Sequence, residues 1–202
     1  DHDVTTEITP TSRAAVFRFT FPESEGSYIV VDAYDRGSYV KIIPEEQKII
    51  GYTTRNSGGV PRNFRNYFVL KFDKPFTYTA SVTEGNISTG SLESESKHSG
   101  GIIGFSTKRG EQVNVRVASS FISHEQAELN LREVGKDSFE KVAEKARKEW
   151  NDVLGRFDVQ DMSDQDRVRT FYSCLYRSVL FPRSFYEIDA KGKVVHYSPC
   201  NG

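Results

Sequence analysis

The sequence predicts a mainly β protein, an antiparallel β-sandwich followed by C-terminal helices. Residues 4–120 hold short apolar or alternating segments, separated by Gly, Asp and Pro turn signals at intervals typical of sandwiches and barrels. The connections between these segments are too short for crossover helices, so the strands should pair antiparallel. From residue 120 onward the hydrophobic period changes to that of amphipathic helices.

Eight segments of the first part have the pattern of strands. In 17–21, Phe-Arg-Phe-Thr-Phe, apolar and polar residues alternate as they do in a half-buried strand. The other seven segments are 28–31, 39–43, 48–54, 67–72, 76–82, 101–105 and 113–117. Turn signals lie between them at 22–26, 35–37, 57–59, 73–75, 84–86 and 108–110. We expect the acidic run 93–95 to be a solvated loop.

Two connecting helices are predicted after residue 120. The first begins with a capping-box pattern at 123–126, and Gly135 stands where that helix should end. The second helix opens at 137–140, presents one apolar face that includes Trp150, and stops at Gly155. Because Trp150 lies on the apolar face, we expect it to pack in a core rather than to stack on a sugar.

A third helix, from Ser163 to Pro182, is unusually apolar. Ser163 with Asp166 should cap it, and Pro182 should end it. Its large apolar residues recur at helical spacing and form a broad stripe: Val168, Phe171, Tyr172, Leu175, Tyr176, Val179 and Leu180. This chain offers few partners for such a stripe, so we expect it to pack against a neighbour that is absent or intermolecular. The pattern indicates a piece of a larger protein, in which a helical domain begins here.

Charge and composition argue against several classes of function. The formal net charge is −1 and the pI is about 6.5, which gives no electrostatic reason to bind nucleic acid or an anionic membrane. No apolar run is long enough to span a bilayer. The histidines at 2, 98, 124 and 196 are isolated from one another and from Cys174 and Cys200, so neither a zinc site nor a disulfide framework is expected.

Two segments carry candidate binding residues. Arg55, Arg62 and Arg65 surround the Gly-rich run 57–61, and such a loop either holds a phosphate or carboxylate group or is simply solvated. The tail 184–202 is aromatic and polar without a regular period, and 189–192 should form a turn between two short extended arms. Long loops of this composition either line binding sites or cover the edge of a domain.

Motifs that match one known family run through nearly the whole chain. In the second half they are 127–131, 139–150 with Leu154, 169–172, 175–177 and 180–182. In the first half they are Arg13, 17–22, 67–68 and 72–76. On these motifs the chain resembles glycoside hydrolase family 92, calcium-dependent exo-acting α-mannosidases typified by α-1,2-mannosidases. Phe17 departs from the pattern, since the family is expected to carry a histidine there.

The resemblance implies a β supersandwich of the galactose-mutarotase type, linking helices, and a C-terminal (α/α)6 toroid with the active site between the domains. With the residue patterns, it places the sandwich at 1–121, a helical linker at 122–160, and the truncated start of the toroid at 161–202. The family's opening segment would precede Asp1. The catalytic acid, the catalytic base and the calcium ligands would lie in the toroid beyond Gly202, so no catalytic or metal-binding residue is assigned in this chain.

The function implied by the resemblance is that of a full-length parent that removes terminal α-linked mannose from N-glycans or mannan with inversion. The chain alone is expected to be inactive. Its expected partners are mannose-containing glycans, the missing helical domain and a second copy of the chain; the implied location is periplasmic or secreted in a bacterium. Tyr186, His196 and Tyr197 of the tail have side chains suited to stacking on or hydrogen-bonding a sugar, and are the candidate substrate-binding residues. The alternative is a carbohydrate-binding or interaction β-sandwich without catalysis.

Overall fold

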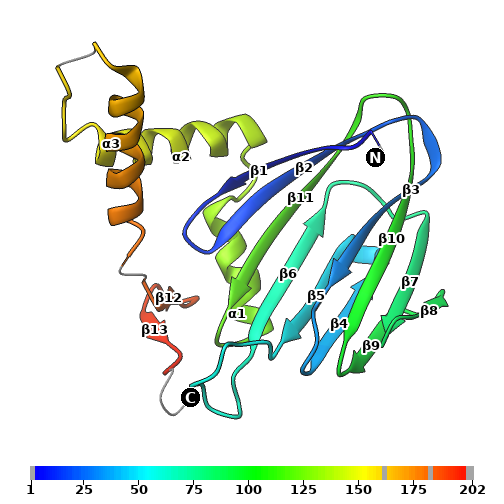
Figure 1. The fold of residues 1–202 in the computed structure, drawn as a ribbon. Coiled ribbons are helices and arrows are strands. Elements are labelled where there is room, and N and C mark those ends of the chain that lie inside the picture. The colour runs from blue at the N-terminus through cyan, green and yellow to red at the C-terminus, as the bar shows by residue number, and fades with distance from the viewer. Residues whose placement is uncertain (1–2, 161–162, 182–183, 199–202) are drawn as a thin grey trace.

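The computed structural model describes residues 3–160, 163–181 and 184–198, and shows two β-sheets packed face to face (Figure 1). The larger sheet has the spatial order β1 (Thr5–Pro10), β2 (Ala14–Phe21), β11 (Glu111–Ser120), β6 (Asn66–Phe72), β5 (Lys48–Thr53), β4 (Ser38–Ile43) and β9 (Glu93–Ser96). The smaller sheet has the order β3 (Ser24–Asp32), β10 (Ser99–Thr107), β7 (Tyr78–Thr83) and β8 (Asn86–Thr89). The strand pairs in both sheets are antiparallel, which confirms the predicted fold class.

All eight predicted strands are present, and β1, β8 and β9 lie outside the predicted segments. The prediction of a solvated loop at 93–95 is wrong, because β9 occupies this acidic run. Ser94 is buried while Glu93 and Glu95 are exposed, and an edge strand tolerates such charges. The predicted turn at 22–26 is too long, because Ser24 already pairs with Thr107 and begins β3.

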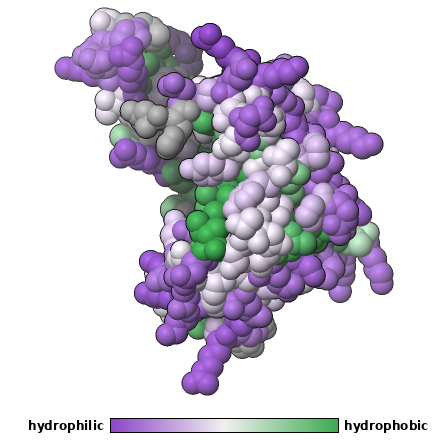
Figure 2. Space-filling model, turned by 90° about the vertical axis from the view of Figure 1, so that its right-hand side faces the viewer, coloured by the Kyte–Doolittle hydropathy of each residue, from purple (hydrophilic) through white to green (hydrophobic). Residues whose placement is uncertain are grey.

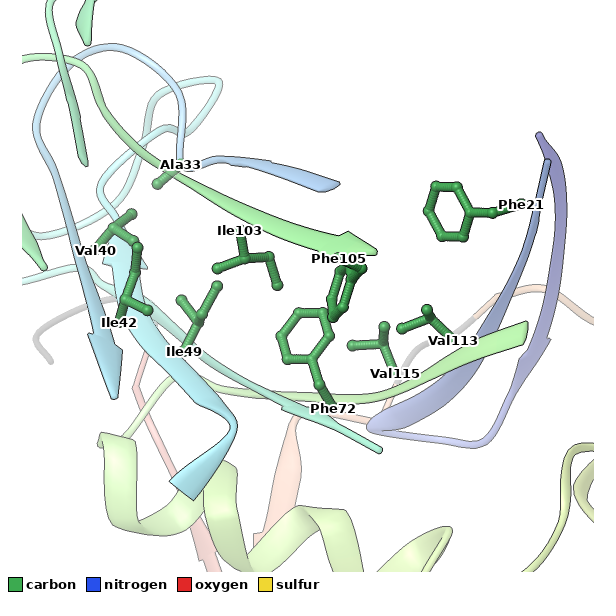
Figure 3. Close-up of a cluster of buried hydrophobic side chains, with 10 residues drawn as sticks. All are labelled: Phe21, Ala33, Val40, Ile42, Ile49, Phe72, Ile103, Phe105, Val113 and Val115. Atoms are coloured by element: carbon green, nitrogen blue, oxygen red, sulfur yellow. The ribbon is translucent and has the colours of Figure 1, made fainter. Parts of the chain in front are cut away.

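The main core lies between the two sheets (Figure 3). Alternation along the strands decides which side chains enter it: in β6, Phe68, Leu70 and Phe72 pack toward the small sheet, while Val69 packs on the opposite face. The buried residues of this core are Phe21, Ala33, Val40, Ile42, Ile49, Phe72, Ile103, Phe105, Val113 and Val115.

Helices cover the outer face of the large sheet and bury a second apolar cluster. α1 (His124–Asn130) contacts β6 and β11, and α2 (Phe139–Leu154) contacts β1 and β2. A short 3-10 turn, η2 (Leu131–Glu133), connects them; a similar turn, η1 (Pro44–Glu46), joins β4 to β5. The buried residues under the helices are Ala14, Val16, Val69, Ala118, Ala127, Val134 and Val142. The large sheet is therefore packed on both faces.

Side-chain caps set the starts of the first two helices. The Ser123 hydroxyl accepts a hydrogen bond from the Gln126 amide, 3.1 Å away, as the capping pattern predicted. α2 begins one residue later than predicted, because Ser138 rather than Asp137 is its N-cap. The Asp137 carboxylate instead pairs with lysines of the helix. Gly155 is the C-cap, as predicted.

The third helix is shorter than its apolar pattern suggested. α3 runs over Gln165–Ser178, and its N-cap is Asp164 rather than Ser163. The Asp164 carboxylate accepts hydrogen bonds from the amides of Asp166 and Arg167, each 3.1 Å away, which is why it displaces the serine. Pro182, predicted to end the helix, lies outside the described residues.

α3 leaves most of its apolar stripe uncovered, and it stands apart from both sheets in Figure 1. Val168 is the one buried residue of this helix, whereas Phe171 and Tyr176 are 40% and 42% exposed. Its contact with α2 is centred on Tyr176 and Trp150, whose ring centroids are 4.6 Å apart. Trp150 thus packs on protein, as predicted, but in a half-buried contact between helices.

The outer face of the small sheet is a second uncovered surface. Figure 2 views the side of the molecule that carries this sheet and shows hydrophobic patches among polar regions. The large exposed apolar residues of β3, β7 and β8 are Tyr28, Val30, Tyr78 and Ile87. Among the described helices, none is long and apolar enough to cross a membrane.

Candidate functional site

The tail that carries the three candidate substrate-binding residues forms a hairpin. β12 (Tyr186–Ile188) pairs with β13 (Val194–His196), so Tyr186 lies opposite His196. The predicted turn at 189–192 is confirmed: the Asp189 carboxylate accepts hydrogen bonds from two backbone amides of the turn, both 2.8 Å away. In Figure 1 the hairpin lies below α2 and beside the lower end of the large sheet.

A buried carboxylate fastens this hairpin to the sandwich. Glu187 is 5% exposed, and its two oxygens accept hydrogen bonds from the Phe121 amide (3.0 Å) and the Asn130 side-chain amide (2.7 Å). Gln126 adds a bond of 2.8 Å from its side-chain amide to the Ile188 carbonyl oxygen. A buried carboxylate needs such donors to offset the loss of water. The first helix after the sandwich therefore also positions the tail.

Arg13 makes a second attachment next to the first. Its guanidinium donates two hydrogen bonds, of 2.9 and 2.6 Å, to the Tyr186 carbonyl oxygen and lies 4.8 Å from the centroid of the Tyr186 ring. The same guanidinium pairs with Glu133 at 2.8 Å. This ion pair and hydrogen bond raise the pKa of Arg13 despite the opposing effect of desolvation, so its charge is firmly retained. The hairpin is thus fixed at both Tyr186 and Glu187.

The structure places the three candidate residues side by side on the hairpin but does not close a pocket around them. Tyr186 lines a hollow of about 100 Å³, well below the roughly 300–1,000 Å³ typical of small-molecule sites. His196 is exposed. The Tyr197 ring lies 6.2 Å from the Phe64 ring, and its hydroxyl lies 3.4 Å from the side-chain oxygen of Asn63. The small hollow beside Tyr186 is not lined by His196 or Tyr197.

The Gly-rich loop with its arginines lies beside the hairpin, at the end of β5 and β6. Arg55 pairs with Asp35 on the neighbouring loop. Arg62 and Arg65 instead line a separate open hollow of about 420 Å³, together with Arg36. The sequence pattern grouped Arg55 with Arg62 and Arg65. In the structure Arg36, from the turn before β4, lines the hollow with Arg62 and Arg65, and Arg55 does not.

A row of aromatic side chains crosses the outer face of the large sheet near this loop. Tyr39, Tyr52 and Tyr67 are cross-strand neighbours on β4, β5 and β6, and His124 packs on them, with its ring 4.8 Å from that of Tyr67. Burial raises the pKa of Tyr39 to about 12, and the hydrogen bond that its hydroxyl donates to Glu93 contributes to the same shift.

The histidine in this row is in an apolar setting. His124 Nδ1 is buried and has no hydrogen-bond partner among the described residues. Burial lowers the pKa of His124, against the smaller effect of the Glu125 charge. Within the described residues, no group of three or more His, Cys, Asp or Glu side chains is arranged to hold a metal ion, so the residues present do not fit a calcium site there.

Sequence patterns could not identify the residues that hold the hairpin. Glu187 and Asn130 stand 57 positions apart, and Arg13 and Tyr186 stand 173 apart. A single glutamate in a polar tail resembles any solvated residue, because its burial depends on partners that only the fold supplies. The one available signal was Arg13, which belongs to the family-like motifs of the first half.

Two family models match the chain. Residues 1–120 match the glycosyl hydrolase family 92 N-terminal domain, and residues 126–202 match the glycosyl hydrolase family 92 catalytic domain. A comparison with curated proteins finds no match.

Solved structures of two bacterial enzymes resemble the chain along nearly its whole length. The family GH92 inverting mannosidase BT2199 from Bacteroides thetaiotaomicron VPI-5482 is 42% identical, with a TM-score of 0.92 over 97% of this chain and 27% of that one. The family GH92 α-mannosidase BT3965 from Bacteroides thetaiotaomicron is 26% identical, with a TM-score of 0.82 over 96% of this chain and 28% of that one. The chain therefore spans little more than a quarter of these relatives, and its two matched segments show that it belongs to glycoside hydrolase family 92.

Proposed function

We propose that the whole protein containing this chain is an exo-acting α-mannosidase that removes terminal α-linked mannose from N-glycans or mannan. The observation that carries the proposal is the 42% identity to an inverting mannosidase over 97% of the chain. A structure of BT3965 in complex with mannoimidazole supports a mannose-like ligand for this family. The match of 126–202 to a catalytic domain favours a hydrolase over the alternative of a non-catalytic binding module.

The division of labour that we propose follows the predicted domains. Residues 1–121 form the sandwich, 122–160 link it to the helical domain, and 161–202 begin the (α/α)6 toroid. The meeting of the two family matches between residues 120 and 126 supports the first boundary. In this scheme the catalytic acid and base, and the calcium ions, would belong to the part of the toroid beyond Gly202, since this chain covers only 27% of the length of the mannosidase BT2199.

In this scheme the hairpin lies at the junction between the sandwich and the toroid. Glu187 and Arg13 fix its position; Tyr186 and His196 are exposed, and Tyr197 contacts Phe64 of loop 54–65. We propose that these three side chains contact the sugar. In the whole enzyme, His196→Ala or Tyr197→Ala should then lower kcat/KM without a matching loss of thermal stability. A loss of stability with unchanged kinetics per folded molecule would instead make the hairpin a structural seal.

The inactivity of the chain alone is tested by assay with calcium on mannobiose and on an aryl α-mannoside. We expect no turnover, because inverting hydrolysis needs two carboxyl groups on opposite sides of the scissile bond, and we assign neither here. Activity that follows the chain through gel filtration would contradict that assignment.

For the whole enzyme, proton NMR of the first product should show the β anomer of mannose; an initial α anomer would rule out inversion. A bacterial periplasmic or secreted location completes the proposal and is testable by cell fractionation.

A further inference from the structure

The hollow that contains Arg62 and Arg65 has the dimensions of a small-molecule site. We call it the arginine groove; it lies where β4 begins and β5 ends, between the turn 34–37, loop 54–65 and edge strand β9. Its volume of about 420 Å³ falls within the range of ligand sites. Its side chains that carry charge or a ring are Arg36, Tyr52, Arg62, Arg65 and Glu95.

Hydrogen bonds to backbone carbonyl oxygens hold together the two loops that form the groove. The Thr54 amide and hydroxyl both donate to the Gly37 carbonyl oxygen, each at 2.9 Å, and the Arg36 guanidinium donates to the Asn56 carbonyl oxygen at 3.0 Å. The Arg55–Asp35 ion pair joins the same loops beside the groove. Arg36 has a φ of 77°, a left-handed conformation that is costly for a residue with a Cβ. These contacts hold it there.

The charges of the groove are not balanced by the protein. Among the described residues, Arg36, Arg62 and Arg65 make no ion pair, although Arg55 of the same loop does. The one acidic residue of the lining, Glu95, already accepts a hydrogen bond of 2.6 Å from the Tyr52 hydroxyl. The lining of the groove thus carries three guanidinium groups against a single carboxylate.

Arg65 is held in place before any ligand arrives. Its guanidinium lies 5.0 Å from the centroid of the Tyr52 ring and donates to the Phe64 carbonyl oxygen at 2.8 Å. A half-buried guanidinium fixed in this way loses little further freedom when it binds, and its planar set of donors matches an oxyanion. Arg62 is exposed and can close over a ligand on Arg65.

We propose that the arginine groove binds an anionic sugar through its phosphate or carboxylate group. Three guanidinium groups that form no ion pair among the described residues select a negative charge, and the groove admits a ligand of monosaccharide size. A nucleic acid is disfavoured because the chain has a net charge of −1. The proposal does not depend on the mannosidase assignment, because binding is measured without turnover.

The test is an NMR titration of the isotope-labelled chain with glucuronate, glucose 6-phosphate, inorganic phosphate and mannose. We expect saturable shifts of the Gly37 and Thr54 amides, which line the groove, with an anionic sugar, and none with mannose at the same concentration. Glucuronate alone would identify a carboxylate as the ligand group, and glucose 6-phosphate alone a phosphate. Inorganic phosphate that binds as tightly as the sugars would overturn the sugar part of the proposal.

Matched variants separate this groove from general charge attraction. Arg62→Gln and Arg65→Gln should each weaken binding about tenfold or more, because each removes a charge-assisted pair. Arg62→Lys keeps the charge but lacks the planar fork, so it should fall between wild type and Arg62→Gln. Arg109→Gln, in the exposed β10–β11 turn, should bind like wild type. Absence of saturable binding by either anionic sugar, or an equal loss in Arg109→Gln, would overturn the proposal.

Discussion

The sandwich and the last helix of this chain differ in how far they bury their apolar side chains. In the sandwich, Ile103 of β10 is 0% exposed, enclosed by residues of both sheets. In α3, a stripe of similar apolar content leaves Phe171 and Tyr176 about two-fifths exposed. A strand finds partners on neighbouring strands and on the facing sheet, all from the same 120 residues. The outer face of the large sheet covers α1 and α2, whereas the stripe of α3 meets only α2 and Phe157 among the described residues.

The largest expected effect contrasts one side chain from each region. Ile103→Ala should lower the free energy of unfolding by about 2–5 kcal/mol, because it opens a cavity in a closed core. Leu175→Ala, in the half-covered stripe of α3, should cost less than about 1 kcal/mol. Urea denaturation followed by circular dichroism measures both. An equal decrease in the free energy of unfolding for both variants would mean that α3 is as firmly packed as the sandwich, which would contradict the difference described here.

The second effect concerns the hairpin, which follows α3 in sequence but is attached to the sandwich. Glu187→Gln replaces one of the two acceptor oxygens with an amino group, which faces either the Phe121 amide or the Asn130 side-chain amide and leaves that donor unsatisfied. An unsatisfied buried polar group costs about 1–3 kcal/mol, so the hairpin should detach first. Hydrogen exchange at Val195 and Ile188 should then accelerate while β10 stays protected. Glu144→Gln, on the exposed side of α2, is the control and should change neither.

The strands were predictable because their information is local, whereas the attachments were not. The alternation in 17–21 identifies β2 directly from its neighbours in sequence. Buried and exposed positions alternate in β9 too. Its exposed positions are glutamates, which an edge strand tolerates, so the sequence looks like a charged loop rather than a strand. Nothing in the sequence links Arg36 to Arg62, since their proximity depends on how β4 pairs with β5. The candidate site is therefore less predictable than the fold.

The third effect follows from the open stripe. If its apolar side chains lack a partner, two copies of the chain should associate through them, since contiguous apolar patches drive association. Light scattering should show a mass that rises with concentration, and Phe171→Ser with Leu175→Ser should reduce that rise several-fold. The control is Val30→Ser, which removes an exposed apolar residue from the small sheet instead. A loss of association in Val30→Ser alone would assign the contact to the sandwich and reverse the comparison.

The smallest effect lies within the sandwich region, where His124 packs on the tyrosine row. Burial lowers the pKa of His124 in the folded chain below its value of about 6.5 in the unfolded chain. Between these two values the unfolded chain binds more protons than the folded one, so the free energy of unfolding should decrease as the pH falls below about 6.5. His124→Gln should flatten this part of the curve, while His196→Gln, which removes an exposed imidazole of the hairpin, should leave it. If both variants retain the slope, His124 does not carry it, and the aromatic row is more open to water than its packing indicates.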